Sequence, residues 1–387
     1  MISLTRLATW RLRLRRLCGL SLTPLSSRLR NSGCAVPNTP PNAPIEMDQV
    51  VAMRDFVERV DNFLENGFTE VNMDFAKLRS TQDDFQLENE YSMSDGFSNV
   101  LLNRYRDVVP YNKNRIKLKD REAPDGDYIN ASFIEYPDVE RKYIAAQAPL
   151  ANTIDDFWYM IGQNNIKVVV MLCKTFENSM SKCVQYYPEN VGETMDIAHG
   201  SVETLKEDKF DEFSIRELKF SHEKFGENVI YQLHYTEWPD HGCPNGLDQV
   251  FRFVELMDDY QIKYAEDKSP VLLHCSAGCG RTGTVVGVDI FRTLIRENKI
   301  NTKIDLREFV LTLRKQRTAF VQSASQYQLL HKLVAHYCKL ALDAADSANK
   351  AEEVVEKCDT DDTNVDAKTS SENNQQLEEE ETVNVRL

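Results

Sequence analysis

The stretch from Ser269 to Thr284 constrains this chain more than any other part, and it reads SPVLLHCSAGCGRTGT. An apolar run at 271–273 follows a proline and predicts a short buried strand. Small residues come next, and a helical pattern begins at Thr284. A strand, a glycine-rich turn and a helix N-terminus together predict an anion-binding loop, because backbone N–H groups and the positive end of the helix dipole converge there.

A cysteine and an arginine flank this loop. Cys275 stands at its start and Arg281 at its end, with five residues between them. A free thiol with a pKa of about 8.5 is only about 3 % thiolate at neutral pH, but N–H donors at a helix start lower that pKa. Arg281 can hold two phosphate oxygens at once, whereas a lysine lacks that forked geometry. The two residues therefore predict nucleophilic phosphoryl transfer to the cysteine.

The glycines of the loop allow a second interpretation. Gly278, Gly280 and Gly283 match the dinucleotide-binding pattern GxGxxG, which also lies between a strand and a helix. However, no clear strand ending in an acidic residue follows about 20 positions later, as that pattern requires. Nucleotide binding would also leave Cys275 and Arg281 without a role, so it is the weaker interpretation.

The segment His274–Gly283 resembles the signature of the cysteine-based protein tyrosine phosphatases, and the resemblance extends over about 48–342. It implies an α/β fold in which α-helices flank a highly twisted mixed β-sheet. It implies that the Thr282 hydroxyl bonds the Cys275 sulfur and that His274 supports the thiolate from behind the loop. The expected phosphate ligands are the backbone N–H groups of Ser276, Ala277, Gly278, Cys279, Gly280 and Arg281.

A second motif is WPDHGCP at 238–244. The leaving oxygen of a tyrosine phosphate is phenolate-like, and an acid that protonates it accelerates the reaction by about 10²–10⁴. Asp240 is the candidate acid, on a loop with rigid ends that Trp238 could anchor. Its pKa must be raised for this task, by desolvation and by the negative charge of the substrate. The alternative is an ordinary turn without a chemical role.

The segment 103–110 resembles the family's phosphotyrosine-recognition loop. Tyr105 would stack on the substrate ring, an aromatic contact worth about 1 kcal/mol. It would also set the depth of the cleft, so that phosphotyrosine reaches the thiolate and the shorter phosphoserine does not. Asp107 would accept backbone N–H bonds from the substrate peptide, and Arg106 would favour acidic flanking residues. Leu102 stands where the family usually has lysine.

Residues 314–327 resemble the family's glutamine loop. Gln322 would orient the water that attacks the phosphocysteine, and Gln326 would assist. An amide suits this task because it both donates to and accepts from water without acting as a nucleophile. Ser323 replaces the usual threonine.

Three further positions bear on the loop. Glu177 and Lys182 lie where the family has a charged pair, and by resemblance Glu177 would hold Arg281 in place. A surface ion pair is an equally good interpretation. Ala148 replaces the usual glycine in a framework segment, and it would be strained if the backbone there needed a positive φ.

Periodicity predicts further elements of the domain. Helices are expected at 51–64 (capped by Asp48), 70–78, from Thr153 through 160, 247–266, 306–313 and 324–342. Strands are expected at 168–172, 213–218 and 229–235.

Composition limits the functional class. The net charge of −15 argues against a nucleic-acid binder. The sequence contains no run of 18 apolar residues, so no membrane span is predicted. The nine cysteines are scattered without CxxC pairs, which favours a reducing compartment over a disulfide scaffold or a zinc ribbon. No metal or cofactor is expected, and the expected partners are phosphotyrosine-containing proteins.

The two ends differ from the expected catalytic domain at 47–343. Residues 1–45 lack acids but contain many arginines, so the leader 1–46 is a candidate mitochondrial transit peptide, a disordered basic segment, or extra sequence before Met47. From Asp343 onward, fourteen acids outnumber four basic residues, so the tail 344–387 is expected to be disordered and to bind a partner or regulate the domain. A cytoplasmic location is expected, with the mitochondrion as the alternative.

Two functional alternatives also follow from the sequence. A phosphatase-like domain could capture phosphotyrosine without hydrolysing it, but the cysteine, the arginine and the acid are all present. A phosphatase for phosphoserine or lipids would be expected to lack the Tyr105 wall.

Cys279 could act as a resolving thiol when Cys275 is oxidised, although packing is the simpler role.

Overall fold

The computed structural model describes residues 45–121, 126–239, 242–244, 246–265 and 269–347. The chain divides into two units after Ile45, and the second unit contains the expected catalytic domain. Asp240, most of the basic leader and residues 348–387 of the acidic tail lie outside the described residues.

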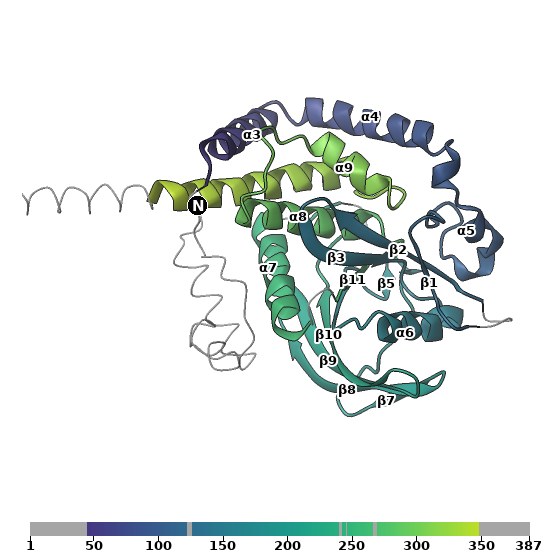
Figure 1. Cartoon of the computed structure of the whole chain (residues 1–387). Coiled ribbons are helices and arrows are strands. Elements are labelled where there is room, and N and C mark those ends of the chain that lie inside the picture. The colour runs from purple at the N-terminus through teal and green to yellow at the C-terminus, as the bar shows by residue number, and fades with distance from the viewer. Residues whose placement is uncertain (1–44, 122–125, 240–241, 245, 266–268, 348–387) are drawn as a thin grey trace, which may run out of the picture. The chain divides into compact units, whose positions relative to one another are not determined.

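A nine-stranded sheet forms the centre of this unit, with strand order β1-β2-β3-β11-β4-β10-β9-β8-β7 in the described part of the chain (Figure 1). The strands are β1 Arg115–Lys117, β2 Tyr128–Tyr136, β3 Val139–Ala146, β4 Val168–Met171, β7 Thr194–Ile197, β8 Gly200–Lys209, β9 Phe213–His222, β10 Gly226–Tyr235 and β11 Val271–His274. The neighbours β3, β11, β4 and β10 run parallel, and the outer pairs are antiparallel. The predicted mixed sheet is confirmed.

Helices surround the sheet. They are α3 Met47–Glu65, α4 Thr69–Phe85, α5 Ser94–Ser98, α6 Ile154–Gln163, α7 Leu247–Tyr264, α8 Gly280–Arg296, α9 Leu306–Arg314 and a last helix whose described part is 324–347. Short 3₁₀ turns lie at η2 Asn89–Tyr91, η3 Val100–Leu102 and η4 Ala151–Thr153. None of the helices in the described ranges combines the length and the apolar character needed to cross a membrane.

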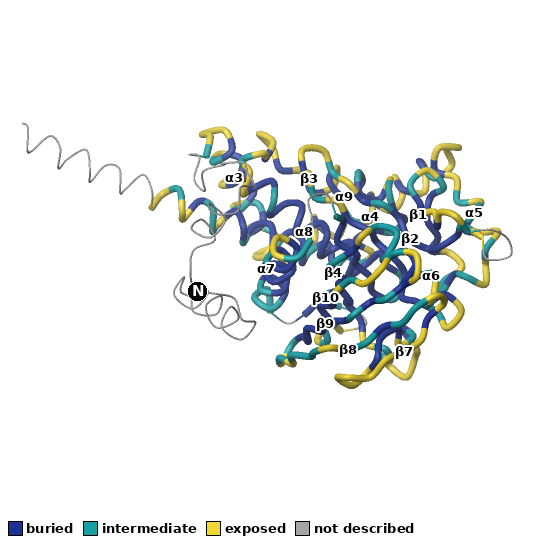
Figure 2. Tube along the Cα trace, turned by 60° about the horizontal axis from the view of Figure 1, so that its bottom comes forward, coloured by how far each residue is buried: buried dark blue, intermediate teal, exposed yellow. Residues whose placement is uncertain are grey.

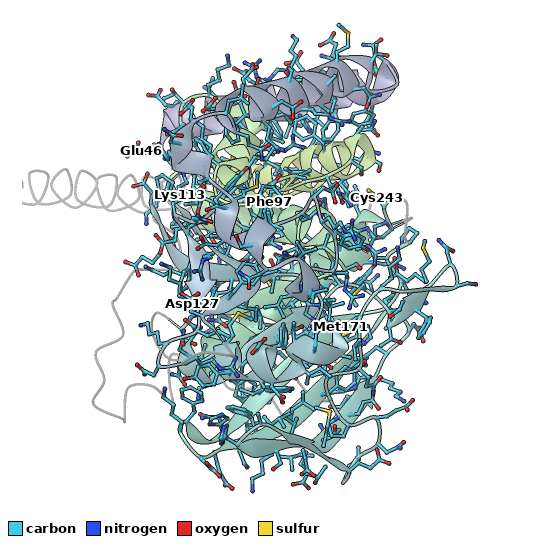
Figure 3. All side chains as sticks on the ribbon, turned by 90° about the vertical axis from the view of Figure 1, so that its right-hand side faces the viewer. Glu46, Phe97, Lys113, Asp127, Met171 and Cys243 are labelled. Atoms are coloured by element: carbon cyan, nitrogen blue, oxygen red, sulfur yellow. The ribbon has the colours of Figure 1, made fainter. Side chains whose placement is uncertain are left out.

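The central strands are buried on both faces, as expected for parallel strands covered by helices. Residues on one face, Val169, Met171 and Leu272, share a core with Phe157 and Met160 of α6. Figure 3 shows Met171 among packed side chains. Helices α7 and α8 contact the same strands and cover the other face (Figure 1). Figure 2 shows the resulting buried centre with exposed loops around it.

Tertiary contacts lengthen several predicted helices. Helix α3 begins at Met47, and Glu46 precedes it without a side-chain cap, so Asp48 lies inside the first turn and is not the predicted cap. Helix α4 continues to Phe85 because Leu78, Gln82 and Phe85 are buried. A buried position is favourable even where the sequence periodicity is weak.

The last helix extends five residues past its predicted end, into the expected tail. Ion pairs join it to α3: Arg54 contacts Asp346 at 3.1 Å, and Asp61 contacts Lys339 at 2.9 Å. The partners are spaced by two helical turns on both helices and run in opposite order, so the helices are antiparallel. His331 also stacks on Phe56 of α3. The described helix therefore includes residues 344–347, which the sequence analysis assigns to the tail.

A buried ionic cluster joins β3 and α7 to α8, the helix that follows the predicted phosphate loop. Arg292 of α8 is 2 % exposed and bonds Glu255 and Asp258 of α7. Arg141 of β3 contacts Asp258 at 2.6 Å and Asp289 of α8 at 2.9 Å. These contacts fix α7 and α8 against the sheet.

Replacing the central arginine tests this cluster. We expect Arg292→Leu to lower the free energy of unfolding by about 3–5 kcal/mol, because it removes a buried cation that pairs with the buried carboxylates of Glu255 and Asp258. Urea unfolding measures the change. The double variant Arg292→Leu/Glu255→Leu should recover part of the loss, and a single variant as stable as the parent would contradict this account.

Candidate active site

The predicted phosphate loop joins β11 to α8, and α8 begins at Gly280, four residues before the predicted start at Thr284. This places Arg281 in the first helical turn. Gly278 has φ +71°, and a Cβ on it would lie 2.1 Å from the Ala146 carbonyl oxygen, so only glycine fits. Its N–H points back to the Cys275 sulfur at 3.3 Å. The loop therefore closes around the sulfur.

The surroundings of Cys275 favour its thiolate. Burial raises the pKa of the thiol, but hydrogen bonding from the side chain and backbone of Thr282, the charge of Arg281 and the Gly278 N–H together lower it below its usual value. The Thr282 hydroxyl is buried, and among the described residues it has no hydrogen-bond partner other than this sulfur. The sulfur is set up as a nucleophile.

Arg281 is held by a buried carboxylate. Its two terminal nitrogens reach the two oxygens of Glu177, each at 2.7 Å, and both side chains are 8 % exposed. One of these nitrogens also donates to the Leu172 carbonyl at 2.9 Å, and the other donates to the Pro239 carbonyl at 3.2 Å. The Glu177 pair is therefore buried, not a surface pair. Its fork fixes the plane of the guanidinium.

A small hairpin positions Glu177. Strands β5 Phe176–Glu177 and β6 Met180–Ser181 are joined by Asn178 and Ser179, whose φ angles are +48° and +61°. Two central residues with positive φ form the tight turn that suits a two-residue hairpin. Sequence reasoning missed this hairpin, because Asn-Ser is a weaker signal than Asn-Gly.

The recognition loop lies against the phosphate loop. The Tyr105 hydroxyl donates to the Ser276 hydroxyl at 2.9 Å, and Ser276 donates to the Lys182 carbonyl at 2.9 Å. Lys182 itself is buried next to the hairpin. Arg106 and Asp107 are exposed, where a bound peptide could reach them. The structure therefore brings Tyr105, Ser276 and Lys182 together.

Arg104 holds the base of the recognition loop, and sequence reasoning gave it no role. It donates to the carbonyl oxygens of Ala148 and Pro149 at 3.2 and 2.5 Å. Ala148 has no positive φ, and its N–H donates to the Ser276 carbonyl at 3.0 Å. The strain considered for Ala148 is therefore absent.

The two glutamines adjoin the start of α8. Gln326 is buried, and its amide oxygen accepts the backbone N–H groups of Gln322 and Ser323 at 2.9 and 3.2 Å. A Cβ on Gly280 would lie 2.9 Å from the Gln326 amide and 3.2 Å from the Gln322 Cβ. Gln322 is exposed. Gln326 thus shapes the turn that presents Gln322, which refines its predicted assisting role.

Arg317 supports the phosphate loop from behind and was also missed. It is fully buried and donates to the carbonyls of Gly278 and Ala277 at 2.7 and 2.9 Å. Because Arg317 binds their carbonyl oxygens on one side, these two peptide groups turn their N–H groups toward the opposite side, the interior of the loop. An arginine inside a buried stretch is the signal that could have identified it.

His274 acts on the backbone of Cys275 rather than on its sulfur. Its Nδ1–H donates to the Cys275 carbonyl at 3.1 Å, and its Nε2 bonds the Tyr186 hydroxyl at 2.9 Å. Burial lowers the pKa of His274 to about 4, so the ring is neutral at pH 7. Any support for the thiolate therefore passes through the backbone of Cys275.

Two remaining predicted residues have structural contacts. Burial raises the pKa of Cys279 to about 12, and its sulfur faces the Ala277 carbonyl at 3.5 Å. This favours packing over a resolving role. Trp238 is buried, and its indole N–H donates to the Gly242 carbonyl at 3.1 Å, across the loop that contains Asp240. Asp240 itself is outside the described residues.

Comparison with known proteins identifies this arrangement. Residues 99–336 match the family model for Protein-tyrosine phosphatase. The chain belongs to the protein-tyrosine phosphatase family.

Relatives in this family are similar over the same domain. The chain is 35% identical over 297 residues to human tyrosine-protein phosphatase non-receptor type 12, covering 75% of this chain and 37% of that protein. It is 37% identical over 250 residues to human tyrosine-protein phosphatase non-receptor type 18, covering 64% of this chain and 53% of that protein. The chain therefore spans about a third to a half of these curated relatives.

Solved phosphatase structures share the fold. The catalytic domain of human protein tyrosine phosphatase non-receptor type 18 has a TM-score of 0.66 at 33% identity, covering 72% of this chain and 99% of that one. A structure described as PTPN18 in complex with HER2-pY1196 phosphor-peptides has a TM-score of 0.69 at 32% identity, covering 74% of this chain and 99% of that one.

The charge state of Cys275 can be tested by alkylation. A lowered pKa means that the thiolate persists below the usual thiol pKa and is lost only as pH falls through the lowered value. We therefore expect iodoacetamide modification of Cys275 to slow less between about pH 9 and about pH 7 than that of an ordinary thiol, which would slow by more than tenfold.

Mass spectrometry locates the modified residue. Cys279 serves as the internal control, because its raised pKa and burial predict no modification in the folded protein. A Cys275 rate that rises with pH like that of a free thiol would contradict the account of this loop.

Proposed function

We propose that this protein is a protein-tyrosine phosphatase that hydrolyses phosphotyrosine in proteins through a phosphocysteine intermediate. One observation carries the proposal. The charge of Arg281, whose guanidinium is held by Glu177, helps to lower the pKa of the Cys275 thiol at the start of the same loop. This combination supplies a nucleophile and a phosphate clamp in one small site.

The proposed reaction has two steps. The Cys275 sulfur attacks phosphorus in line, the S–P bond forms, and the P–O bond to tyrosine breaks as Asp240 gives its proton to the departing oxygen. A water oriented by Gln322 then attacks the phosphocysteine, Asp240 takes its proton, and the sulfur leaves with help from the Thr282 hydroxyl. Arg281 and the loop N–H groups stabilise the equatorial oxygens in both transition states.

Selectivity for phosphotyrosine rests on Tyr105. Its hydroxyl is tied to the phosphate loop through Ser276, so the ring stands as a wall beside the nucleophile. A fixed wall favours a flat aromatic substrate that can stack on it. The solved structure of protein tyrosine phosphatase non-receptor type 18 with phosphotyrosine peptides supports the same substrate class for this chain.

The proposed working environment is the reducing cytoplasm. Cysteines 173, 183, 243, 275, 279 and 338, in the described part of the chain, are all free thiols. Free buried thiols persist where glutathione and thioredoxin keep them reduced. The mitochondrial alternative depends on the leader, residues 1–46.

Turnover of a phosphotyrosine peptide by the full chain, with a chelator present, tests the proposal. We expect the parent to release phosphate, Cys275→Ser to release none, and Asp240→Ala to lose about 10²–10⁴ in kcat with little change in KM. The same peptide with phosphoserine is the substrate control and should not turn over.

Binding measurements complete the test. Cys275→Ser should still bind the phosphotyrosine peptide, because the clamp and the wall remain. A folded parent that binds the peptide without hydrolysing it would show a phosphotyrosine-binding module instead of an enzyme.

A further inference from the structure

A line of buried hydrogen bonds runs from the sheet to the nucleophile. Arg216 of β9 donates to the Gln232 amide oxygen at 2.9 Å, and the Gln232 amide nitrogen donates to the Tyr186 hydroxyl at 2.7 Å. Tyr186 then bonds His274 at 2.9 Å, and His274 bonds the Cys275 carbonyl at 3.1 Å. Gln232 and His274 are 0 % exposed and Arg216 is 9 % exposed, so bulk water does not compete with these bonds.

The chemistry of the two ends gives every bond in this line one direction. The guanidinium of Arg216 can only donate, so Gln232 presents its oxygen to Arg216 and its NH₂ to Tyr186. The Cys275 carbonyl can only accept, so His274 carries its proton on Nδ1 and leaves Nε2 to accept from the Tyr186 hydroxyl. The only competing acceptor recorded for that hydroxyl within the described residues is the Met171 sulfur at 3.9 Å, a weak partner.

We propose that Gln232 and Arg216 are positioning residues for the nucleophile, acting through Tyr186 and His274 on the Cys275 peptide. The inference rests on the proposed function, because it concerns the reactivity of the proposed nucleophile. Hydrogen bonds in a line polarise one another in a low-dielectric interior. A polarised Cys275 carbonyl strengthens the dipole of the Cys275–Ser276 peptide, whose N–H belongs to the phosphate loop.

Arg216 is itself rigidly held at the outer end. It contacts Glu207 at 2.6 Å and lies over the Tyr187 ring at 4.5 Å. It also bonds Nδ1 of His234 at 3.3 Å. It lines a pocket of about 340 Å³ together with residues of β8, of β10 and of the segments 174–176 and 185–189. The ion pair with Glu207 would hold Arg216 without Gln232, so the glutamine is the link that connects this anchor to the loop.

The direct neighbours of the Cys275 sulfur lie outside this line. Arg281, Thr282 and the Gly278 N–H act on the sulfur from α8 and the loop, and the thiol of Cys173 lies near it at the end of β4. Replacing Gln232 changes none of these groups. A change in nucleophile reactivity would therefore come through His274.

The sharpest test is Gln232→Glu in the full chain. The new carboxylate can still bond Arg216 and Tyr186, but it only accepts, so the Tyr186 hydroxyl turns to it and away from His274. We expect kcat on a phosphotyrosine peptide and the rate of Cys275 alkylation at about pH 7 to fall about three- to tenfold, with KM little changed. Gln232→Leu removes both bonds and should act in the same direction.

The matched control is Thr204→Val on the neighbouring strand β8. Thr204 is 0 % exposed, and its hydroxyl donates to the Pro188 carbonyl at 2.8 Å, outside the line. The Thr204→Val variant should be less stable in urea unfolding, but its kcat and its rate of Cys275 alkylation should not change.

Three outcomes decide the inference. Unchanged alkylation and kcat in both Gln232 variants would overturn it and leave the line a purely structural feature. An equal loss in Thr204→Val would overturn it as well, because the effect would then follow general weakening of the sheet. If the parent hydrolyses no peptide, the proposed function fails, whereas slower alkylation in the Gln232 variants alone still supports the inference.

Discussion

The buried fork between Arg281 and Glu177 is the interaction on which the rest of the site depends. A guanidinium out of water is favourable only when a carboxylate and carbonyl oxygens satisfy its donors, and here Glu177, Leu172 and Pro239 do so. These partners come from residues 172–177, which run from the end of β4 into the hairpin, and from the segment 238–244. One side chain of α8 therefore aligns two segments that are far from it in the sequence.

The sequence could predict the loop around Cys275 because the residues that form it are contiguous. Cys275, the glycines and Arg281 lie within one turn, and the strand before them and the helix after them follow from hydrophobic periodicity. The mixed sheet followed from the family resemblance. The start of α8 was placed too late, because Gly280 and Gly283 have poor helix propensity. Both nevertheless lie in the helix, where a Cβ on either would collide with residues of the segment 314–327.

What sequence could not predict depends on contacts between distant segments. Arg104, Arg317 and Tyr186 are ordinary residues in their local context, and each gains its role from a carbonyl or a ring nitrogen contributed by another part of the chain. The extension of the last helix to 347 has the same cause, since its final turns meet α3. Periodicity describes one element at a time, and these roles belong to pairs of elements.

The antiparallel pairing of α3 with the last helix has a consequence for the integrity of the protein. Because Arg54 meets Asp346 and Asp61 meets Lys339, α3 and the last helix stabilise each other. Cleavage that removed one of these helices would free the other to fray. A domain fused directly before Met47 or directly after Ser347 would enter at the same corner of the described domain, so the choice between these two positions matters less than the length of the linker.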